Sequence, residues 1–286
     1  MDKRKRKRWI VLVALCALLA CLIPYLLWAN TVLTVSHVEL DLLPGEGSFT
    51  IAQVSDLHNA EFGGGNGELL TILEEVEPDL IAITGDLIDS RRTDPAPALA
   101  FLEGAVELAP VCYVTGNHEF RAYDAYQDLK SQMEELGVIV LENESMVLEE
   151  VPLRVIGLDD PSFGVRSDPS ATPEQILQGA LTALAPQAGE EDLRTVLLAH
   201  RPEYVELYAQ HGADLVLSGH AHGGQVRLPG VGGLYAPGQG FLPAYTSGLY
   251  QIGETSLVVS RGLGNGTPFP RLWNAPELVV VTMRAS

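Results

Sequence analysis

Short apolar runs rich in Val and Ile recur along the chain, and they constrain its fold more than any other feature of the sequence. Continuous apolar runs of this length are typical of strands that are buried on both faces of a sheet. They lie at residues 49–55, 79–85, 111–116, 153–158, 195–200 and 214–219. Patterns with helical spacing lie between several of them, at 67–78, 97–109, 122–137 and 172–186. This alternation predicts an α/β layer fold.

The C-terminal part of the chain has a different pattern. Glycine and proline are dense from 223 to 240, which predicts loops and hairpins. Apolar runs at 255–262 and 277–283 then predict two strands that pair with each other in a second sheet. Two aromatic-rich stretches, 240–250 and 267–273, are expected to pack beneath that sheet rather than to form an apolar rim for a lipid tail.

The N-terminus has the composition of a membrane anchor. Residues 3–8 are all basic, and residues 9–28 carry no charge. An apolar stretch of this length spans a bilayer as a helix, and the basic block predicts that its end stays in the cytoplasm. A cleaved signal peptide and a lipoprotein modified at Cys21 are the alternatives. Because residues 26–30 offer no good cleavage site and the chain stays apolar after Cys21, we predict an uncleaved signal anchor.

The charge of the remaining chain excludes one class of partner. Without residues 3–8 and Asp2, 12 basic residues remain against 36 acidic ones, which is a net charge of −24. Proteins that bind nucleic acid need basic surfaces, so no nucleic-acid partner is expected.

Side chains that can bind metal follow five of the apolar runs. In open α/β sheets, ligands bind at the carboxyl ends of the strands. Five of the seven histidines lie at these strand ends. The candidate residues there are Asp56, His58, Asp86, Asp89, Asn117, His118, His200, His220 and His222. We therefore expect them to meet at one edge of the fold.

The residue types in this set indicate the chemistry. Asp, His and Asn without Cys suit divalent Mn, Zn or Fe. Asp56 and His58 point to the same side if they continue a strand, because alternate residues of a strand share a face. The potential ligands are too many for one ion with an open position. They suit two ions about 3.5–4 Å apart that share a carboxylate, an arrangement used for phosphoester hydrolysis.

Five sequence blocks occur in a fixed order between Asp56 and His222: Asp-x-His, Gly-Asp-x-x-Asp, Gly-Asn-His-Glu, a lone His after a strand, and Gly-His-x-His. This ordered set resembles the calcineurin-like metallophosphoesterases. The segments SDLH, AHRPE, GHAHGGQ and SRGLGNG behind a membrane segment are similar to the bacterial membrane-associated branch of that family. Some members of that branch and its relatives cleave a UDP-diacylglucosamine pyrophosphate. The resemblance implies a two-sheet αββα sandwich behind an N-terminal transmembrane helix.

The resemblance also implies a role for each candidate residue. One metal would be held by Asp56, His58 and His222, the second by Asn117, His200 and His220, and Asp86 would bridge them. His118 would be the proton donor to the leaving group, and Asp89 would orient it. A hydroxide between the two cations would be the nucleophile, since metal binding lowers the pKa of water from about 15.7 to about 7.

Three features depart from the family pattern. Glu119 stands where many relatives have Asp, and we expect it to act behind the ligands at most. Arg91 and Arg92 follow the bridging aspartate without the glycine that some relatives have, and are expected to be solvated loop arginines. The segment 160–192 matches no motif, and both a lid and a plain surface helix fit it.

The predicted organisation is a cytoplasmic basic tail at 1–8, a single-pass signal anchor at 9–28, a linker and first strand at 29–48, and an extracytoplasmic metallophosphoesterase domain at 49–286. The predicted function is metal-dependent hydrolysis of a phosphodiester, pyrophosphate or phosphomonoester, with lipid-linked substrates among the candidates. Phospholipid head groups, cyclic nucleotides and wall polymers are also open as substrates. The alternative is a non-catalytic, metal-dependent binding protein of the envelope. His118 argues against it, because a binding protein has no use for a proton donor.

Overall fold

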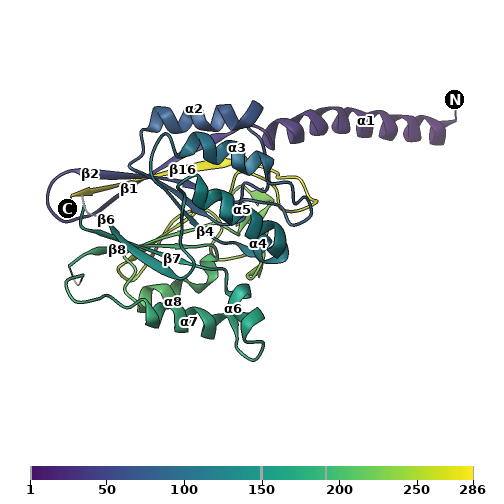
Figure 1. The fold of residues 1–286 in the computed structure, drawn as a ribbon. Helices are drawn as coiled ribbons and strands as arrows, with labels where there is room; N and C mark the ends of the chain where they lie inside the picture. Colours follow the sequence, from purple (N-terminus) through teal and green to yellow (C-terminus); the bar gives the residue numbers. More distant parts are fainter. Residues whose placement is uncertain (1, 149–150, 191, 286) are drawn as a thin grey trace.

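A computed structural model describes residues 2–148, 151–190 and 192–285. Within these residues, two six-stranded sheets pack against each other (Figure 1). The first has the order β1 (Thr34–Leu43), β16 (Glu277–Ala285), β2 (Ser48–Val54), β3 (Leu80–Thr84), β4 (Val111–Val114) and β5 (Ile139–Val140). The second has the order β14 (Gly248–Ile252), β15 (Thr255–Val259), β9 (Leu215–Ser218), β8 (Arg194–Ala199), β7 (Leu153–Leu158) and β6 (Glu144–Leu148).

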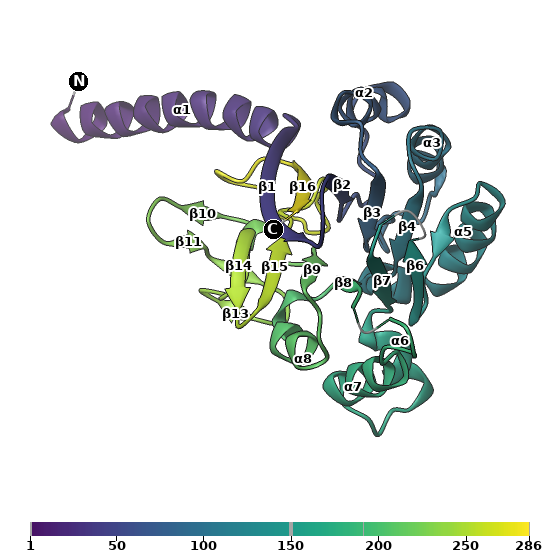
Figure 2. The same ribbon diagram turned by 90° about the vertical axis from the view of Figure 1, so that its left-hand side faces the viewer.

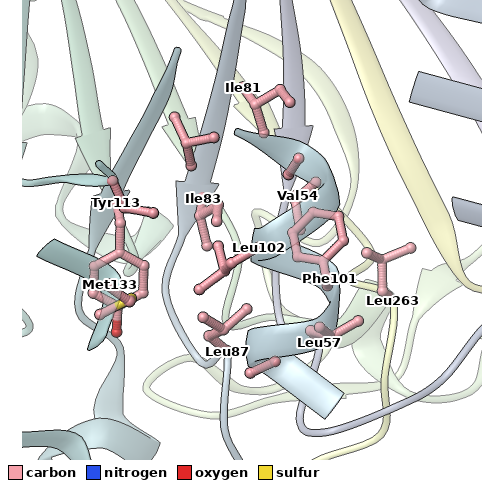
Figure 3. Close-up of a cluster of buried hydrophobic side chains, with 14 of the residues drawn as sticks. Val54, Leu57, Ile81, Ile83, Leu87, Phe101, Leu102, Tyr113, Met133 and Leu263 are labelled. Atoms are coloured by element: carbon pink, nitrogen blue, oxygen red, sulfur yellow. The ribbon is translucent and has the colours of Figure 1, made fainter. Parts of the chain in front are cut away.

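Helices cover the outer faces of both sheets (Figure 2). The first sheet is covered by α2 (Gly67–Val76), α3 (Ala96–Ala105) and α5 (Tyr123–Glu135), and the second by α7 (Pro173–Ala183) and α8 (Val205–Gln210). Phe101 and Leu102 of α3 pack over Ile83 and Val54 of the first sheet (Figure 3). The four layers confirm the αββα sandwich that the resemblance implied.

The layers explain why the strands are apolar on both faces. In β2, Ile51 points into the core between the sheets, whereas Ala52 and Val54 point into the core beneath the helices. Strands β2, β3 and β4 are parallel, as are β7, β8 and β9. Parallel strands with helices on their outer face are buried on both sides, which gives continuous apolar runs instead of alternation.

The predicted pairing of the two C-terminal strands is wrong. Strand β16 lies in the first sheet, parallel to β1 and antiparallel to β2. Strand β15 lies in the second sheet, parallel to β9. Val281 of β16 faces the core between the sheets, and Leu278 faces the core beneath the helices. An apolar run indicates that a strand is buried on both faces, but it does not indicate which strands pair with that strand.

Helix α1 (Lys3–Ala29) projects away from the sandwich (Figures 1 and 2). It is long and apolar enough to cross a membrane, and none of the apolar window is buried against the rest of the chain. Strand β1 follows it and falls within the range 29–48, where the sequence predicts a linker and a first strand. The domain boundaries drawn from the sequence stay a prediction.

The segment 160–192 contributes a helix to the outer face of the second sheet, whereas its Phe163 packs against the core beneath the helices of the first sheet. It contains α6 (Pro161–Ser167) and α7, and residue 191 lies outside the described residues. A capping box begins α7: the Thr172 hydroxyl accepts from Gln175 N, and the Gln175 side chain accepts from Thr172 N. Leu177 and Leu181 are buried against the second sheet. Helix α7 is therefore a packed surface helix.

We predict that Gly157→Ala destabilises the sandwich. A Cβ at Gly157 in β7 would lie 2.2 Å from Leu141 Cβ and 2.8 Å from Val114 Cγ1, where the two sheets meet. Overpacking of this kind costs about 1–3 kcal/mol of unfolding free energy. Urea unfolding of the full chain in detergent measures the change.

Gly179→Ala is the matched control for this prediction. Gly179 lies inside α7, and a Cβ there would meet nothing within 4 Å. We expect it to raise the unfolding free energy by about 0.5–1 kcal/mol, because alanine favours helix. Equal unfolding midpoints for the two variants would contradict the packing described here.

Candidate dinuclear metal site

The carboxyl ends of five strands meet at one edge of the sandwich and carry the candidate residues. Two loops follow β2 and β3, and the short helix α4 (Asn117–Arg121) follows β4. In the second sheet, the relevant loops follow β8 and β9. The nine candidates are all buried there: Asp56, His58, Asp86, Asp89, Asn117, His118, His200, His220 and His222. Six of them lie in two contiguous ligand groups, which share one residue.

The first group consists of Asp56, His58, Asp86 and His222, whose ligand atoms all lie within 4.8 Å of one another. His58 Nε2 lies 3.2 Å from His222 Nε2, and the latter lies 3.4 Å from Asp56 Oδ1. Burial lowers the pKa of both His58 and His222 to about 3. Both rings are therefore neutral, which is the form in which imidazole binds a metal.

The second group consists of Asp86, His200 and His220, so that Asp86 belongs to both groups. His200 Nε2 lies 3.3 Å from Asp86 Oδ2 and 3.1 Å from His220 Nδ1. His200 Nδ1 lies 2.8 Å from Thr84 O. Because a carbonyl only accepts, Nδ1 carries a hydrogen and Nε2 faces the group, as is usual for a metal-binding histidine.

The Asp86 carboxylate favours a proton on His200 when no metal is bound. Burial alone would lower the pKa of His200, but the adjacent Asp86 carboxylate raises that pKa to about 10. His200 and Asp86 therefore form a buried ion pair. A metal ion that binds here has to replace this proton, because histidine coordinates in its neutral form.

Asn117 lies beside the second group. Oriented to satisfy its neighbours, its amide donates to His220 Nδ1 over 2.8 Å and accepts from His118 N over 3.2 Å and from Arg121 Nη1 over 2.9 Å. Imidazole and carboxylate groups without thiolates suit divalent Mn, Zn or Fe. The residues in both groups therefore fit divalent metal ions.

His118 lies beside the first group, outside both. Its ring centroid is 4.4 Å from that of His58. Ser90 N donates to His118 Nδ1 over 3.1 Å, so the neutral ring carries its proton on Nε2. Asp89 Oδ1 also lies 3.4 Å from His118 Nδ1. The sequence indicated Asp89 as the orienting residue, but it gave no signal for the Ser90 contact.

Arg91 and Arg92 are exposed loop arginines, as the sequence predicted, and they also have defined contacts. Both side chains are exposed, yet both pair with buried Asp89, at 3.1 and 3.4 Å. Arg92 also donates to His58 O over 3.3 Å. These contacts hold the loop after β3 against the loop after β2.

Glu119 joins the loops that carry the ligands. Its buried carboxylate accepts from Asp86 N over 2.9 Å, from Gly116 N over 2.8 Å and from Ile88 N over 3.2 Å. Burial and the neighbouring Asp86 raise the pKa of Glu119 to about 7. The sequence placed Glu119 behind the ligands, and the structure gives it three backbone donors there.

Five of the ligand residues have left-handed backbone conformations. The φ angles are 52° at Asp56, 47° at His58, 53° at Asp86, 66° at His220 and 46° at His222. Such angles are uncommon outside glycine, and each costs about 1–3 kcal/mol. Backbone strain of this kind occurs where several side chains have to point toward one position. Nothing in the local sequence predicted it.

The SRGLGNG segment packs against the loop that carries Asp56 and His58. A Cβ at Gly262 would lie 2.7 Å from Asp56 Cβ, and one at Gly266 would lie 2.5 Å from His58 Nε2. The absence of side chains lets this segment approach the ligands closely. The sequence analysis used this motif for the resemblance and gave it no structural role.

Two further residues, half-buried Glu203 and buried Arg271, lie close to the candidate metal-binding histidines and were not found from the sequence. The carboxylate of Glu203, in the AHRPE segment, lies 4.0 Å from His220 Nε2. Arg271 Nη2 lies 3.4 Å from His222 Nδ1, while Arg271 Nη1 donates to Arg261 O over 2.8 Å. The AHRPE motif could have drawn attention to Glu203, but Arg271 lies in a loop without a recognisable pattern.

Comparison with known proteins places these residues in a family. A family model described as calcineurin-like phosphoesterase matches residues 49–224. The uncharacterized metallophosphoesterase YkuE of Bacillus subtilis is 31% identical over 265 residues, which cover 88% of this chain and 86% of that protein. YkoQ of the same organism, also an uncharacterized metallophosphoesterase, is 30% identical over 268 residues, 90% of this chain and 93% of that protein. The phosphodiesterase YaeI of Escherichia coli is 29% identical over 224 residues, 76% of each chain. This chain therefore belongs to the calcineurin-like phosphoesterases and is a phosphoester hydrolase.

Proposed function

We propose that this hydrolase is anchored in the cytoplasmic membrane and uses two divalent ions, drawn from Mn, Zn and Fe, to cleave a phosphodiester, pyrophosphate or phosphomonoester. The observation that carries the proposal is the position of Asp86, whose carboxylate belongs to both buried ligand groups. A carboxylate that belongs to two ligand groups is expected where two metal ions are bound close together. The name of one relative, a phosphodiesterase, supports the phosphodiester among these bonds.

The ligand groups would divide as the resemblance implies. One ion would be held by Asp56, His58 and His222, the other by Asn117, His200 and His220, with Asp86 between them. When bound, such ions supply positive charge to the phosphate and lower the pKa of the attacking water to about 7.

His118 is proposed to protonate the leaving oxygen. The donor would be the positively charged ring, which gives up the proton on Nε2 and keeps the one on Nδ1. The Asp89 carboxylate, held by Arg91, lies 3.4 Å from Nδ1 and the Ser90 hydroxyl lies 3.2 Å from it, so they can accept from this N–H and balance the charge on the ring. These contacts fix the direction in which the ring presents its proton.

The membrane anchor is proposed from α1. Its basic first residues, 3–8, favour a cytoplasmic N-terminus, which places the sandwich on the extracytoplasmic side. The single-pass anchor would hold the active site near a membrane surface.

We predict that His118→Ala affects substrates according to their leaving group. A general acid contributes about 10²–10⁴ to the rate, and it matters most when the departing oxygen is strongly basic. We therefore expect a large fall in kcat for an alkyl phosphodiester and a much smaller one for bis(nitrophenyl) phosphate. Steady-state kinetics of the Mn²⁺-loaded protein on both substrates measure this difference.

Metal content is the control for this experiment. His118→Ala should retain both ions in elemental analysis, whereas Asp86→Asn should lose metal together with activity on both substrates. Equal losses on the two substrates would refute the proton-donor role. Activity that survives Asp86→Asn would refute the shared role of Asp86, and no activity in the loaded parent protein would favour the non-catalytic binding protein.

We also predict that metal binding stabilises the fold. A ligand at 100 times its dissociation constant adds about 2.7 kcal/mol to the unfolding free energy, which shifts Tm by about 5–10 °C in a chain of this size. Chelator treatment should therefore lower Tm, and Mn²⁺ or Zn²⁺ should restore it. The shift should persist in His118→Ala and shrink in Asp86→Asn. A Tm that does not respond to metal would contradict the site.

A further inference from the structure

An apolar groove lies between the end of α1 and the loop that follows His222. One wall carries Leu22 and Leu26 of α1, and the other carries Val226, Leu234, Phe269 and Leu272. Its volume is about 390 Å³, and its accessible surface is apolar. Grooves of about 300–1,000 Å³ hold small ligands. The residues that line this one indicate a hydrocarbon occupant.

The loop that carries His222 leads into the groove. Gly224 and Gln225, two and three residues after His222, line it. Gln225 Nε2 donates to Phe269 O over 2.5 Å, and Asn274 Nδ2 donates to His222 O over 2.7 Å. The backbone that positions a metal ligand therefore also shapes the groove.

Large apolar side chains stand exposed on the loops around the groove. Phe241 is 83% exposed, Phe269 68% and Trp273 54%. The expectation that 240–250 and 267–273 pack beneath the second sheet is wrong for these residues, although Tyr245 and Tyr250 do pack against it. Exposed apolar patches mark interaction surfaces, and aromatic side chains gather at membrane interfaces.

The end of α1 is fixed to this surface by a pair of hydrogen bonds. Arg271 N donates to Asn30 Oδ1 over 2.8 Å, and Asn30 Nδ2 donates to Arg271 O over 3.1 Å. Figure 2 shows β10 (Arg227–Leu228) and β11 (Gly232–Gly233) on the same side of the sandwich as α1. With α1 in a bilayer, the exposed loops lie where the helix leaves it.

We propose that the groove receives an acyl chain of a lipid from the bilayer that holds α1, so that the substrate is a membrane lipid with a phosphoester head group. Two wall residues belong to the membrane helix itself, which opens the groove to the lipid phase. The head-group chemistry rests on the proposed hydrolase function, whereas binding of the acyl chain does not. A lipid seated here brings its head group toward the loop that carries His222.

Photo-crosslinking tests the groove. The full chain is reconstituted in nanodiscs that contain a phospholipid with a diazirine near the end of one acyl chain, and mass spectrometry maps the linked residues. We expect links in 224–235 and 267–272 in addition to α1. Diacylglycerol with the same chains should compete for these links, and glycerol phosphate should not. Links confined to α1, or to exposed rim residues such as Phe241 and Trp273, would overturn the proposal.

The substitution Phe269→Asp tests the apolar wall of the groove. Phe269 is exposed, so the fold does not depend on its ring. Crosslinking in the groove should fall by about ten-fold or more, because an unpaired carboxylate in an apolar wall is costly. The control is Val147→Asp on β6, an exposed valine outside the groove, which should leave the links unchanged. Equal crosslinking in the two variants would also overturn the proposal.

The Asp86→Asn protein separates the two proposals. Its crosslinks should match those of the parent chain, because acyl-chain binding needs no metal. Hydrolysis of a soluble phosphodiester by the parent chain without groove crosslinks would refute the lipid groove alone. Groove crosslinks without any hydrolysis would refute the proposed function and leave the groove in place.

Discussion

The Asp86 carboxylate is the contact on which the rest of the site depends. It is buried, it pairs with His200, and His118 N donates to its Oδ1 over 2.7 Å. A second buried carboxylate, Glu119, binds the backbone of the same loop. Two carboxylates in one buried place repel each other and lose hydration, so their persistence requires compensating positive charge. The sandwich supplies the rigid frame that holds this unfavourable arrangement together.

Stability and function are separated in space. Strands β2, β3, β8 and β9 are apolar and regular until their last residues, and the cores on both sides of each sheet hold them in place. The left-handed residues begin immediately beyond these ends, as at Asp56 and His220. Close contacts of Gly219 and Gly262 with Asp56 leave no room for side chains behind it. The packing of the cores therefore offsets the conformational strain of the left-handed backbone at the ligand residues.

Local sequence patterns predicted an α/β layer fold and brought the candidate metal-binding residues to one sheet edge, whereas the αββα sandwich was implied by the family resemblance. A continuous apolar run predicts a strand that is buried on both faces, whichever strands are its neighbours. The residues that follow the run lie at the end of that strand. Long-range features were not accessible in this way. The neighbours of β16, the contact of Ser90 with His118 and the contact of Arg271 with His222 depend on chain segments far apart in sequence. The exposure of Phe241 and Phe269 was also missed, because composition cannot distinguish a packed aromatic ring from an exposed one.

The position of β16 has a consequence for synthesis of the chain. Among the described residues, β16 is the only neighbour of β1, and it separates β1 from β2. The first sheet therefore stays open along two edges until residues 277–285 have been made. Pairings that join distant segments form late and slowly, and open edges recruit other chains. A nascent chain thus depends on chaperones, or on rapid completion, to avoid aggregation before its last strand closes the sheet.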